Sequence, residues 1–261
     1  MVIINNKYNI IEKLGSGAFG TIFKCQNIRT KELVAVKVEP ISLDLKLLKN
    51  ETKIYNALKG CNGIPTIKWF GKDDVNYYMV LDLLGPSLNQ LLLQNSKFSL
   101  HDTLQVGIKI VLLLKSIHSK GLIHRDVKPD NFLFKNDELF IIDFGFCKSY
   151  LNPDNSHIKL KKLSNMIGSK NYCSISSHKH IELSRRDDLE SLGYMLIYFY
   201  LGNLTWTNDT NEEIIVSKKQ DIHNIVPQVI IDFILYTRNL DFDEEPDYNY
   251  IVQLFTKECE K

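Results

Sequence analysis

The eight residues His-Arg-Asp-Val-Lys-Pro-Asp-Asn, at positions 124–131, combine side chains suited to moving a phosphoryl group onto a hydroxyl. Asp126 can accept the proton of the attacking hydroxyl, and Lys128 can neutralise charge on the transferred group. Asn131, and Asp143 in the later Asp-Phe-Gly run, offer oxygen ligands to a divalent metal. The order and spacing of these groups favour this chemistry over a chance set of turn-forming residues.

A second candidate pair is Lys37, in the apolar run Val34-Ala35-Val36-Lys37, and Glu51, fourteen positions later. A lysine held by a glutamate can bind α- and β-phosphates as a fixed point charge. A lone lysine on a strand usually points to solvent. On this pair alone, the two interpretations remain comparable.

The run Gly15-Ser16-Gly17-Ala18-Phe19-Gly20 lies between two predicted strands. Glycines lack a Cβ, so their backbone N–H groups can approach phosphates closely. A hairpin without a ligand is an equally reasonable interpretation of the glycines alone. A dinucleotide-binding turn would need a helix next, whereas Thr21-Ile22-Phe23 reads as strand. The strand context favours a flap over ATP.

The composition excludes several other classes of protein. The 261 residues carry 32 Lys+Arg and 31 Asp+Glu, a net charge of +1, which argues against a dedicated nucleic-acid or membrane-surface binder. At 44% hydrophobic residues, the chain should fold into one large domain or two lobes. Five irregularly spaced cysteines, no signal peptide and no apolar run of membrane length predict reduced thiols and a cytoplasmic or nuclear, unsecreted protein.

Hydrophobic periodicity supplies the elements that must position these groups. The first third alternates like a sheet, interrupted by one helix with an apolar stripe, and the pattern becomes helical after Gly85-Pro86. A helix near 188–201 is apolar nearly all round and should be buried, whereas 148–177 reads as a long functional loop or a disordered one. The predicted strands are 8–14, 22–26, 33–38, 67–70, 77–81, 131–134 and 139–142, and the other helices are 47–58 and 99–120.

Together these motifs resemble the eukaryotic protein kinases, and the likeness covers nearly the whole chain. The similarity is closest to the casein kinase I family, of which the chain resembles a short member without a regulatory tail. Ser174-Ile175-Ser176 stands where most kinases have Ala-Pro-Glu. Four further stretches carry the family likeness: 51–55 (Glu-Thr-Lys-Ile-Tyr), 63–67 (Gly-Ile-Pro-Thr-Ile), 83–88 (Leu-Leu-Gly-Pro-Ser-Leu) and 184–194 (Ser-Arg-Arg-Asp-Asp-Leu-Glu-Ser-Leu-Gly-Tyr).

The resemblance implies an α+β, bilobal fold with an antiparallel-sheet lobe at 1–84 and a mainly helical lobe at 85–261. It implies a monomeric protein serine/threonine kinase that uses Mg²⁺ and ATP on protein substrates and needs no activating phosphorylation. Asp126, Lys128, Lys37 and Glu51 would be catalytic, Asn131 and Asp143 would bind metal, and Asp188 would anchor the catalytic loop. The implied nucleotide contacts are Leu14, Gly15, Gly17, Gly20, Ile22, Ala35, Lys37, Leu81, Asp82, Leu84, Leu133 and Ile142.

One departure from the family concerns the substrate. The casein kinase I family prefers acidic or already phosphorylated (primed) substrates and binds them through a basic site, whose arginine corresponds here to Asn171. The family's lysine-rich segment is replaced by an acidic one at 208–213, for which Lys218 and Lys219 compensate only in part. Arg125, Lys148 and Lys170 are the remaining candidates for a substrate anion site. We expect a weakened preference for primed substrates.

Two other functions fit parts of the pattern. A pseudokinase that only binds partners would be expected to lack some of the catalytic set, all of which is present. A small-molecule phosphotransferase is disfavoured by the match at 184–194. The His178-Lys179-His180 run is interpreted as a solvated loop and not as a metal site, and Cys147 and Cys173 as ordinary buried residues.

Overall fold

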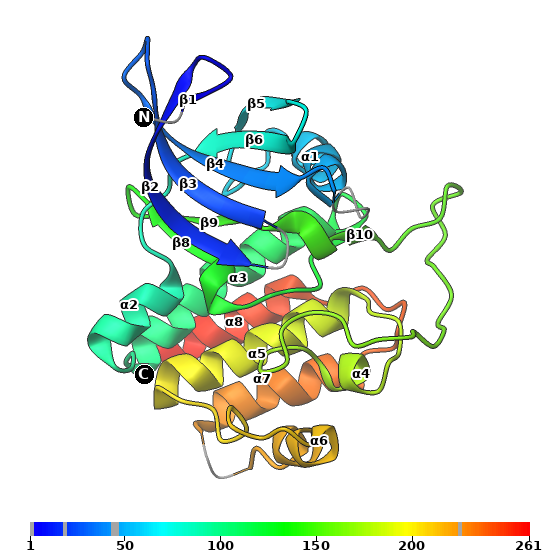
Figure 1. Ribbon diagram of the computed structural model, residues 1–261. Coiled ribbons are helices and arrows are strands. Elements are labelled where there is room, and N and C mark those ends of the chain that lie inside the picture. The colour runs from blue at the N-terminus through cyan, green and yellow to red at the C-terminus, as the bar shows by residue number, and fades with distance from the viewer. Residues whose placement is uncertain (1–2, 18–19, 43–46, 224–225) are drawn as a thin grey trace. The chain divides into compact units, whose positions relative to one another are not determined.

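The computed structural model describes residues 3–17, 20–42, 47–223 and 226–261 (Figure 1). The chain forms two compact units. Unit 1 contains Met1–Gly85 and Leu133–Gly145, and unit 2 contains Pro86–Phe132 and Phe146–Lys261. The chain therefore passes between the units three times, whereas the sequence analysis placed a single boundary between residues 84 and 85.

Unit 1 is built on a six-stranded antiparallel sheet. Alternation along its fourth strand puts Val34 and Val36 into an apolar core with Tyr8 and Trp69. Ala35 and Lys37 consequently lie on the opposite face. The strand order is β1-β2-β3-β4-β6-β5, with β1 (Ile3–Ile4), β2 (Tyr8–Gly17), β3 (Gly20–Asn27), β4 (Leu33–Pro40), β5 (Ile67–Lys72) and β6 (Asn76–Asp82).

One helix, α1 (Leu47–Ala57), packs against β5 and β6. Its first turn contains no acidic residue, but Glu39 of β4 accepts a hydrogen bond from the N–H of Leu48 at 2.9 Å. A carboxylate at this end of a helix stabilises the unpaired N–H groups. The hairpin of β8 (Phe132–Lys135) and β9 (Glu138–Ile141) turns at Asn136 and Asp137, both with positive φ, and its strands confirm those predicted at 131–134 and 139–142.

Unit 2 is mainly helical. Thirteen of the seventeen residues of α5 are buried, which confirms the prediction of a buried helix near 188–201. The α5 helix packs against α3 and α7, and α8 packs against α3 and α7 as well. The helices are α2 (Leu88–Asn95), α3 (Leu100–His118), α4 (Ile175–His178), α5 (Arg185–Leu201), α6 (Glu212–Gln220), α7 (Gln228–Asn239) and α8 (Tyr248–Cys259).

The segment from 146 to 174 has a defined path, although the sequence offered a disordered loop as one interpretation. Its first strand, β10 (Lys148–Ser149), pairs with β7 (Leu122–Ile123), which lies just before residues 124–131. An isolated bridge then joins Lys162 to Ile181. Within the described residues, no helix is both long and apolar enough to span a membrane.

Candidate functional site

Lys37 is the central charged group of unit 1. Its Nζ lies 2.8 Å from Oε2 of Glu51 and 2.8 Å from Oδ1 of Asp143, and its side chain is only 10% exposed. Burial by itself would lower the pKa of Lys37, but the charges of Glu51 and Asp143 outweigh it and raise that pKa above the ordinary value. Lys37 is therefore a fixed cation and does not point to solvent.

The predicted glycines differ in what the fold requires of them. Gly20 has a φ of +122°, and a Cβ there would lie 2.1 Å from the carbonyl oxygen of Val38. Cβ atoms at Gly15 and Gly17 would meet no atom within 4 Å. Packing therefore explains Gly20 only, while open space beside Gly15 and Gly17 suits the approach of a phosphate to the backbone. Ala18 and Phe19 lie outside the described residues.

The other predicted nucleotide contacts also belong to unit 1. Cross-strand pairing places Leu81 opposite Ala35, and Ile22 opposite Lys37. The N–H of Gly85 donates to the carbonyl of Phe134 at 2.7 Å, so the end of the segment Met1–Gly85 lies beside β8. All members of the predicted nucleotide set lie in the two segments of this unit: Leu14, Gly15, Gly17, Gly20, Ile22, Ala35, Lys37, Leu81, Asp82, Leu84, Leu133 and Ile142.

The predicted base, Asp126, is the centre of a hydrogen-bonded loop in unit 2. Its side chain is nearly buried, and Oδ2 lies 2.6 Å from Nζ of Lys128. The amide Nδ2 of Asn131 donates to the backbone carbonyl of Asp126 at 2.9 Å. These contacts fix the carboxylate of Asp126. Because the amide nitrogen of Asn131 is already used, the amide oxygen is the atom that Asn131 can offer to a cation.

Ser169 is a functional candidate that the sequence analysis missed. Its Oγ donates a hydrogen bond to Oδ1 of Asp126 at 2.7 Å, across 43 residues of chain. Gly168, with a φ of +90°, makes this approach possible, because a Cβ there would lie 2.5 Å from the carbonyl of Arg125. The Gly168-Ser169 pair is the sign of this role in the sequence, but only the tertiary structure shows that the hydroxyl of Ser169 meets Asp126.

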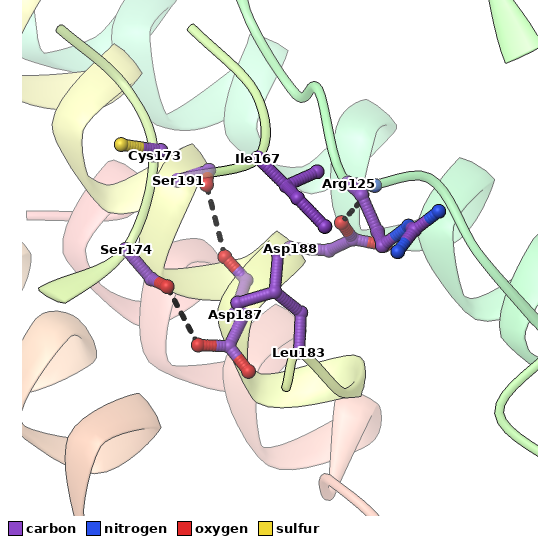
Figure 2. A pocket seen from close by; sticks show the side chains of 8 residues that line it. All are labelled: Arg125, Ile167, Cys173, Ser174, Leu183, Asp187, Asp188 and Ser191. Carbon is purple, nitrogen blue, oxygen red and sulfur yellow. Dashed lines mark hydrogen bonds between the residues drawn. The ribbon is translucent and has the colours of Figure 1, made fainter. Parts of the chain in front are cut away.

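The loop that contains Asp126 is held by Asp188, in the first turn of α5 (Figure 2). Its two oxygens accept hydrogen bonds from the backbone N–H groups of His124, at 2.7 Å, and Arg125, at 2.8 Å. Burial would raise the pKa of Asp188, but the hydrogen bond and charge of His118, together with the His124 contacts, lower it instead. The contact fixes Arg125 in a left-handed conformation (φ +66°) beside Asp126.

Asp143 also has a left-handed backbone, with a φ of +65°. Strained non-glycine residues concentrate at functional sites. The carboxylate of Asp143 and the amide oxygen of Asn131 are the hard oxygen donors that Mg²⁺ prefers, so the residues fit such an ion. The described residues contain no group of three or more His, Cys, Asp or Glu side chains arranged to hold a metal unaided.

The three candidates for a substrate anion site do not form one set. Arg125 and Lys148 both approach the buried carboxylate of Glu182, at 4.0 and 2.8 Å. Lys170 instead donates to the backbone carbonyl of Asp209. The sequence analysis also expected Lys219 to compensate in part for the missing arginine. Its side chain is fully buried, so it cannot contact a substrate at the surface.

The interpretation of His178 as part of a solvated loop is wrong. The side chain is buried, and its Nε2 lies 3.0 Å from Nζ of Lys219 and 3.3 Å from Sγ of Cys173. Burial, followed by the charge of Lys219, lowers the pKa of His178 to about 4, so the ring is neutral at pH 7. Lys219 also donates to the carbonyl of Cys173 at 2.6 Å, which attaches this segment to α6.

With this geometry described, comparison with known families gives one clear match. Residues 8–260 match the family described as protein kinase domain, which covers almost the whole chain. The chain belongs to the protein kinase domain family. The predicted α+β protein-kinase fold is confirmed, and membership implies phosphotransfer from ATP, with a divalent metal, to protein substrates.

Proposed function

We propose that the chain is an active protein serine/threonine kinase of casein kinase I type, with Mg²⁺ as its metal. The observation that carries this proposal is the arrangement around Asp126, whose two oxygens contact Lys128 and Ser169. The lysine two residues after the aspartate, Lys128, is a feature in which the chain resembles serine/threonine kinases. The four family-like stretches and Ser174-Ile175-Ser176 support the narrower assignment.

In this proposal each unit contributes its own step. Lys37, fixed by Glu51 and Asp143, binds the α- and β-phosphates of the nucleotide, and Leu81, Ala35 and their neighbours contact the adenine. Asp126 orients the substrate hydroxyl and accepts its proton, while Lys128 neutralises charge on the transferred phosphoryl group. Bound to Asn131 and Asp143, the metal would neutralise phosphate charge during transfer. The lobe boundaries, the monomeric state and the cytoplasmic or nuclear location belong to the same proposal.

The decisive experiment is transfer of labelled phosphate from ATP to casein and to an unbiased peptide library, with the Asp126→Asn protein as control. We expect label on serine and threonine and not on tyrosine. Nucleotide binding without transfer by the unmodified chain would establish the alternative, a pseudokinase that acts as a binding scaffold. Tyrosine labelling would contradict the serine/threonine assignment.

We further propose that primed substrates are only weakly preferred. Asn171 stands at the arginine position of the family, and its backbone carbonyl accepts a hydrogen bond from Trp206. Lys218 already pairs with Asp209 at 2.9 Å, and Lys170 donates to the backbone of the same residue. The missing guanidinium removes a charge-assisted contact worth about 1.5–3 kcal/mol.

Matched peptides that differ only in one upstream phosphoserine would test this preference. We expect kcat/KM for the two peptides to differ by less than tenfold, which is about 1.4 kcal/mol. Restoring the family residue by Asn171→Arg should increase the ratio in favour of the primed peptide. A strong primed preference in the unmodified chain would overturn this part of the proposal.

A further inference from the structure

One lysine of unit 2 is buried completely, away from the group of side chains around Asp126. Lys219 lies near the end of α6, and it is 0% exposed. Lysine is rarely buried to this extent unless it is paired, because removing an ammonium group from water is costly. The contacts of its Nζ must therefore account for the position of this side chain.

Two backbone carbonyls of one short segment are the main partners of Lys219. Its Nζ donates to the carbonyl of Cys173 at 2.6 Å and to that of Lys170 at 3.0 Å. Nζ also lies 3.0 Å from Nε2 of His178, a neutral ring that can accept the third N–H of the ammonium group. Nδ1 of the same ring has no hydrogen-bond partner in the described part of the chain, so the two carbonyls are the firmer contacts.

Two aromatic rings support the charge of Lys219. Its Nζ lies 4.6 Å from the centroid of the Tyr194 ring and 5.8 Å from that of the Trp206 ring, distances at which a cation is attracted to the face of a ring. Burial is the largest influence on the pKa of Lys219 and lowers it to about 8, so the ammonium form still predominates at pH 7.

Trp206 holds the same segment at a third carbonyl. Its indole is fully buried, and Nε1 donates to the carbonyl of Asn171 at 2.8 Å. The N–H groups of Tyr172 and Cys173 both donate to the carbonyl of Ser169, at 2.9 and 2.8 Å, and close a tight turn. We call residues 169–173 the Ser169 turn. Lys219 and Trp206 together bind three of its carbonyls.

The place of this turn matters for the proposed chemistry. Oγ of Ser169 donates to Oδ1 of Asp126 at 2.7 Å. A substrate hydroxyl that gives its proton to Asp126 must lie within about 3.2 Å of the same carboxylate, so the Ser169 turn borders the position of the substrate. A displacement of about 1 Å in such an arrangement can lower the rate about 100-fold.

We propose that Lys219 is a positioning residue: by binding the carbonyls of Lys170 and Cys173 it fixes the Ser169 turn and, through the hydroxyl of Ser169, the carboxylate of Asp126. This inference rests on the proposed kinase activity. An apolar side chain of similar volume would fill the same space without the cost of burying a charge. The lysine is needed because only its N–H groups can bind the carbonyls of the turn.

The test replaces Lys219 by methionine in the full chain, which keeps an unbranched apolar side chain and removes all three N–H donors. Transfer from ATP is measured with one unprimed peptide. We expect kcat/KM for the peptide to fall by about 10- to 100-fold, with less than about a twofold change in the KM for ATP, because the predicted nucleotide contacts lie in unit 1. Lys179→Met, an exposed lysine next to His178, is the matched control and should keep both values.

A double-mutant cycle separates positioning from a simple loss of folded protein. If Lys219 acts through Ser169, Lys219→Met should lower kcat/KM by less than about threefold when Ser169 is already replaced by alanine. A smaller folded fraction would instead lower kcat/KM by the same factor in both backgrounds. Equal factors, or an unchanged kcat/KM in Lys219→Met alone, would overturn the inference.

Amide hydrogen exchange gives a readout that needs no catalysis. We expect exchange at residues 169–173 to become faster in Lys219→Met, with exchange in α3 unchanged, because the turn then opens locally. If the unmodified chain transfers no phosphate, the proposed function fails, and this comparison still decides whether Lys219 fixes the turn. Unchanged exchange at 169–173 would show that it does not.

A second variant covers the case in which Lys219→Met does not fold. Trp206→Phe keeps a buried aromatic ring and removes one donor to the Ser169 turn, the N–H bound to the carbonyl of Asn171. We expect kcat/KM for the peptide to fall by about 3- to 10-fold, as for the loss of one hydrogen bond. An unchanged kcat/KM in this folded variant would show that fixing the turn does not affect transfer, and would overturn the inference equally.

Discussion

Asp126 is the residue on which the proposed chemistry depends most directly. Its surroundings are polar and fixed: Lys128 and Ser169 contact its oxygens, and Asn131 binds its backbone. None of these partners is needed to fill a core, so the arrangement is better explained by the orientation of one carboxylate than by stability. The same loop contains Asp130, which is exposed and contacts Asn89 instead.

Replacing Asp126 by asparagine should therefore separate catalysis from binding. We expect kcat to fall by about 10²–10⁴-fold, the usual contribution of a positioned base. Nucleotide affinity, measured by titration with a fluorescent ATP analogue, should be nearly unchanged, because the predicted nucleotide contacts lie in unit 1. Asp130→Asn is the matched control and should keep its kcat; equal losses in both variants would contradict the assignment of Asp126 as base.

The glycine loop gives a second prediction at the scale of single residues. Gly20→Ala should destabilise the chain by about 1–3 kcal/mol, because the methyl group collides with the backbone of Val38 at an unfavourable φ. Gly17→Ala should leave the Tm almost unchanged, since open space surrounds its Cβ position, but should raise the KM for ATP. Thermal unfolding and ATP titration measure the two effects, and a Gly17→Ala protein with unchanged ATP kinetics would argue against the phosphate role.

At the scale of elements, the first turn of α5 anchors two parts of unit 2. Asp188 holds the loop that contains Asp126, while the neighbouring Asp187 accepts hydrogen bonds from Oγ of Ser174, at 2.6 Å, and the N–H of Ser184, at 2.8 Å. Both aspartates line a cavity of about 10 Å³, room for about one water molecule (Figure 2). Two adjacent carboxylates thus attach two different segments to one buried helix.

Asp187 should make stability depend on pH. Burial is the largest influence and raises its pKa from 3.8 to about 6, although Ser174 and Ser184 oppose the shift. The folded state therefore keeps a proton that the unfolded chain releases near 3.8. The stability contributed by Asp187 is fully present below pH 3.8, falls as pH rises through this range and is lost above 6.

The matched variant for this prediction is Asp187→Asn, which cannot titrate. We expect the free energy of unfolding of the unmodified chain, relative to the variant, to fall by up to about 3 kcal/mol between pH 4 and pH 7. Urea unfolding at several pH values measures this difference. A difference that is independent of pH would show that the pKa of Asp187 is not raised in the folded protein.

At the scale of the whole molecule, unit 2 depends on its last helix. Ile251 and Phe255 of α8 are fully buried. The ring of Phe255 packs edge-on against Phe233 of α7, with ring centroids 5.1 Å apart. A Cβ at Gly107 of α3 would lie 3.2 Å from this ring, which shows how closely α3 and α8 approach.

Removing the Phe255 ring should therefore destabilise unit 2 as a whole. We expect Phe255→Ala to lower the free energy of unfolding by about 3–5 kcal/mol, as for other large-to-small core substitutions. Urea unfolding followed by far-ultraviolet circular dichroism measures the loss. Gln253→Ala, an exposed position on the same helix, is the control, and a similar effect of both substitutions would show that α8 does not complete the core.

The amino-acid sequence by itself determined the local elements and the identity of the chemical groups. Periodicity and turn residues predicted five strands of the sheet, the β8–β9 hairpin and the buried α5, because these patterns are local properties of the chain. Spacing made Lys37, Glu51, Asp126, Asn131 and Asp143 candidates, because phosphoryl transfer uses side chains of those types. The β1 strand and the helices α2, α4, α6 and α7 were not predicted.

Only the tertiary structure decided which distant groups meet. The short segment 133–145 returns to unit 1, so that Asp143 reaches Lys37 across 106 residues of chain. Ser169 meets Asp126, Lys148 meets Glu182, and Lys219 becomes buried instead of exposed. These contacts depend on the packing of elements against each other and on the burial of charge, and spacing along one chain encodes neither.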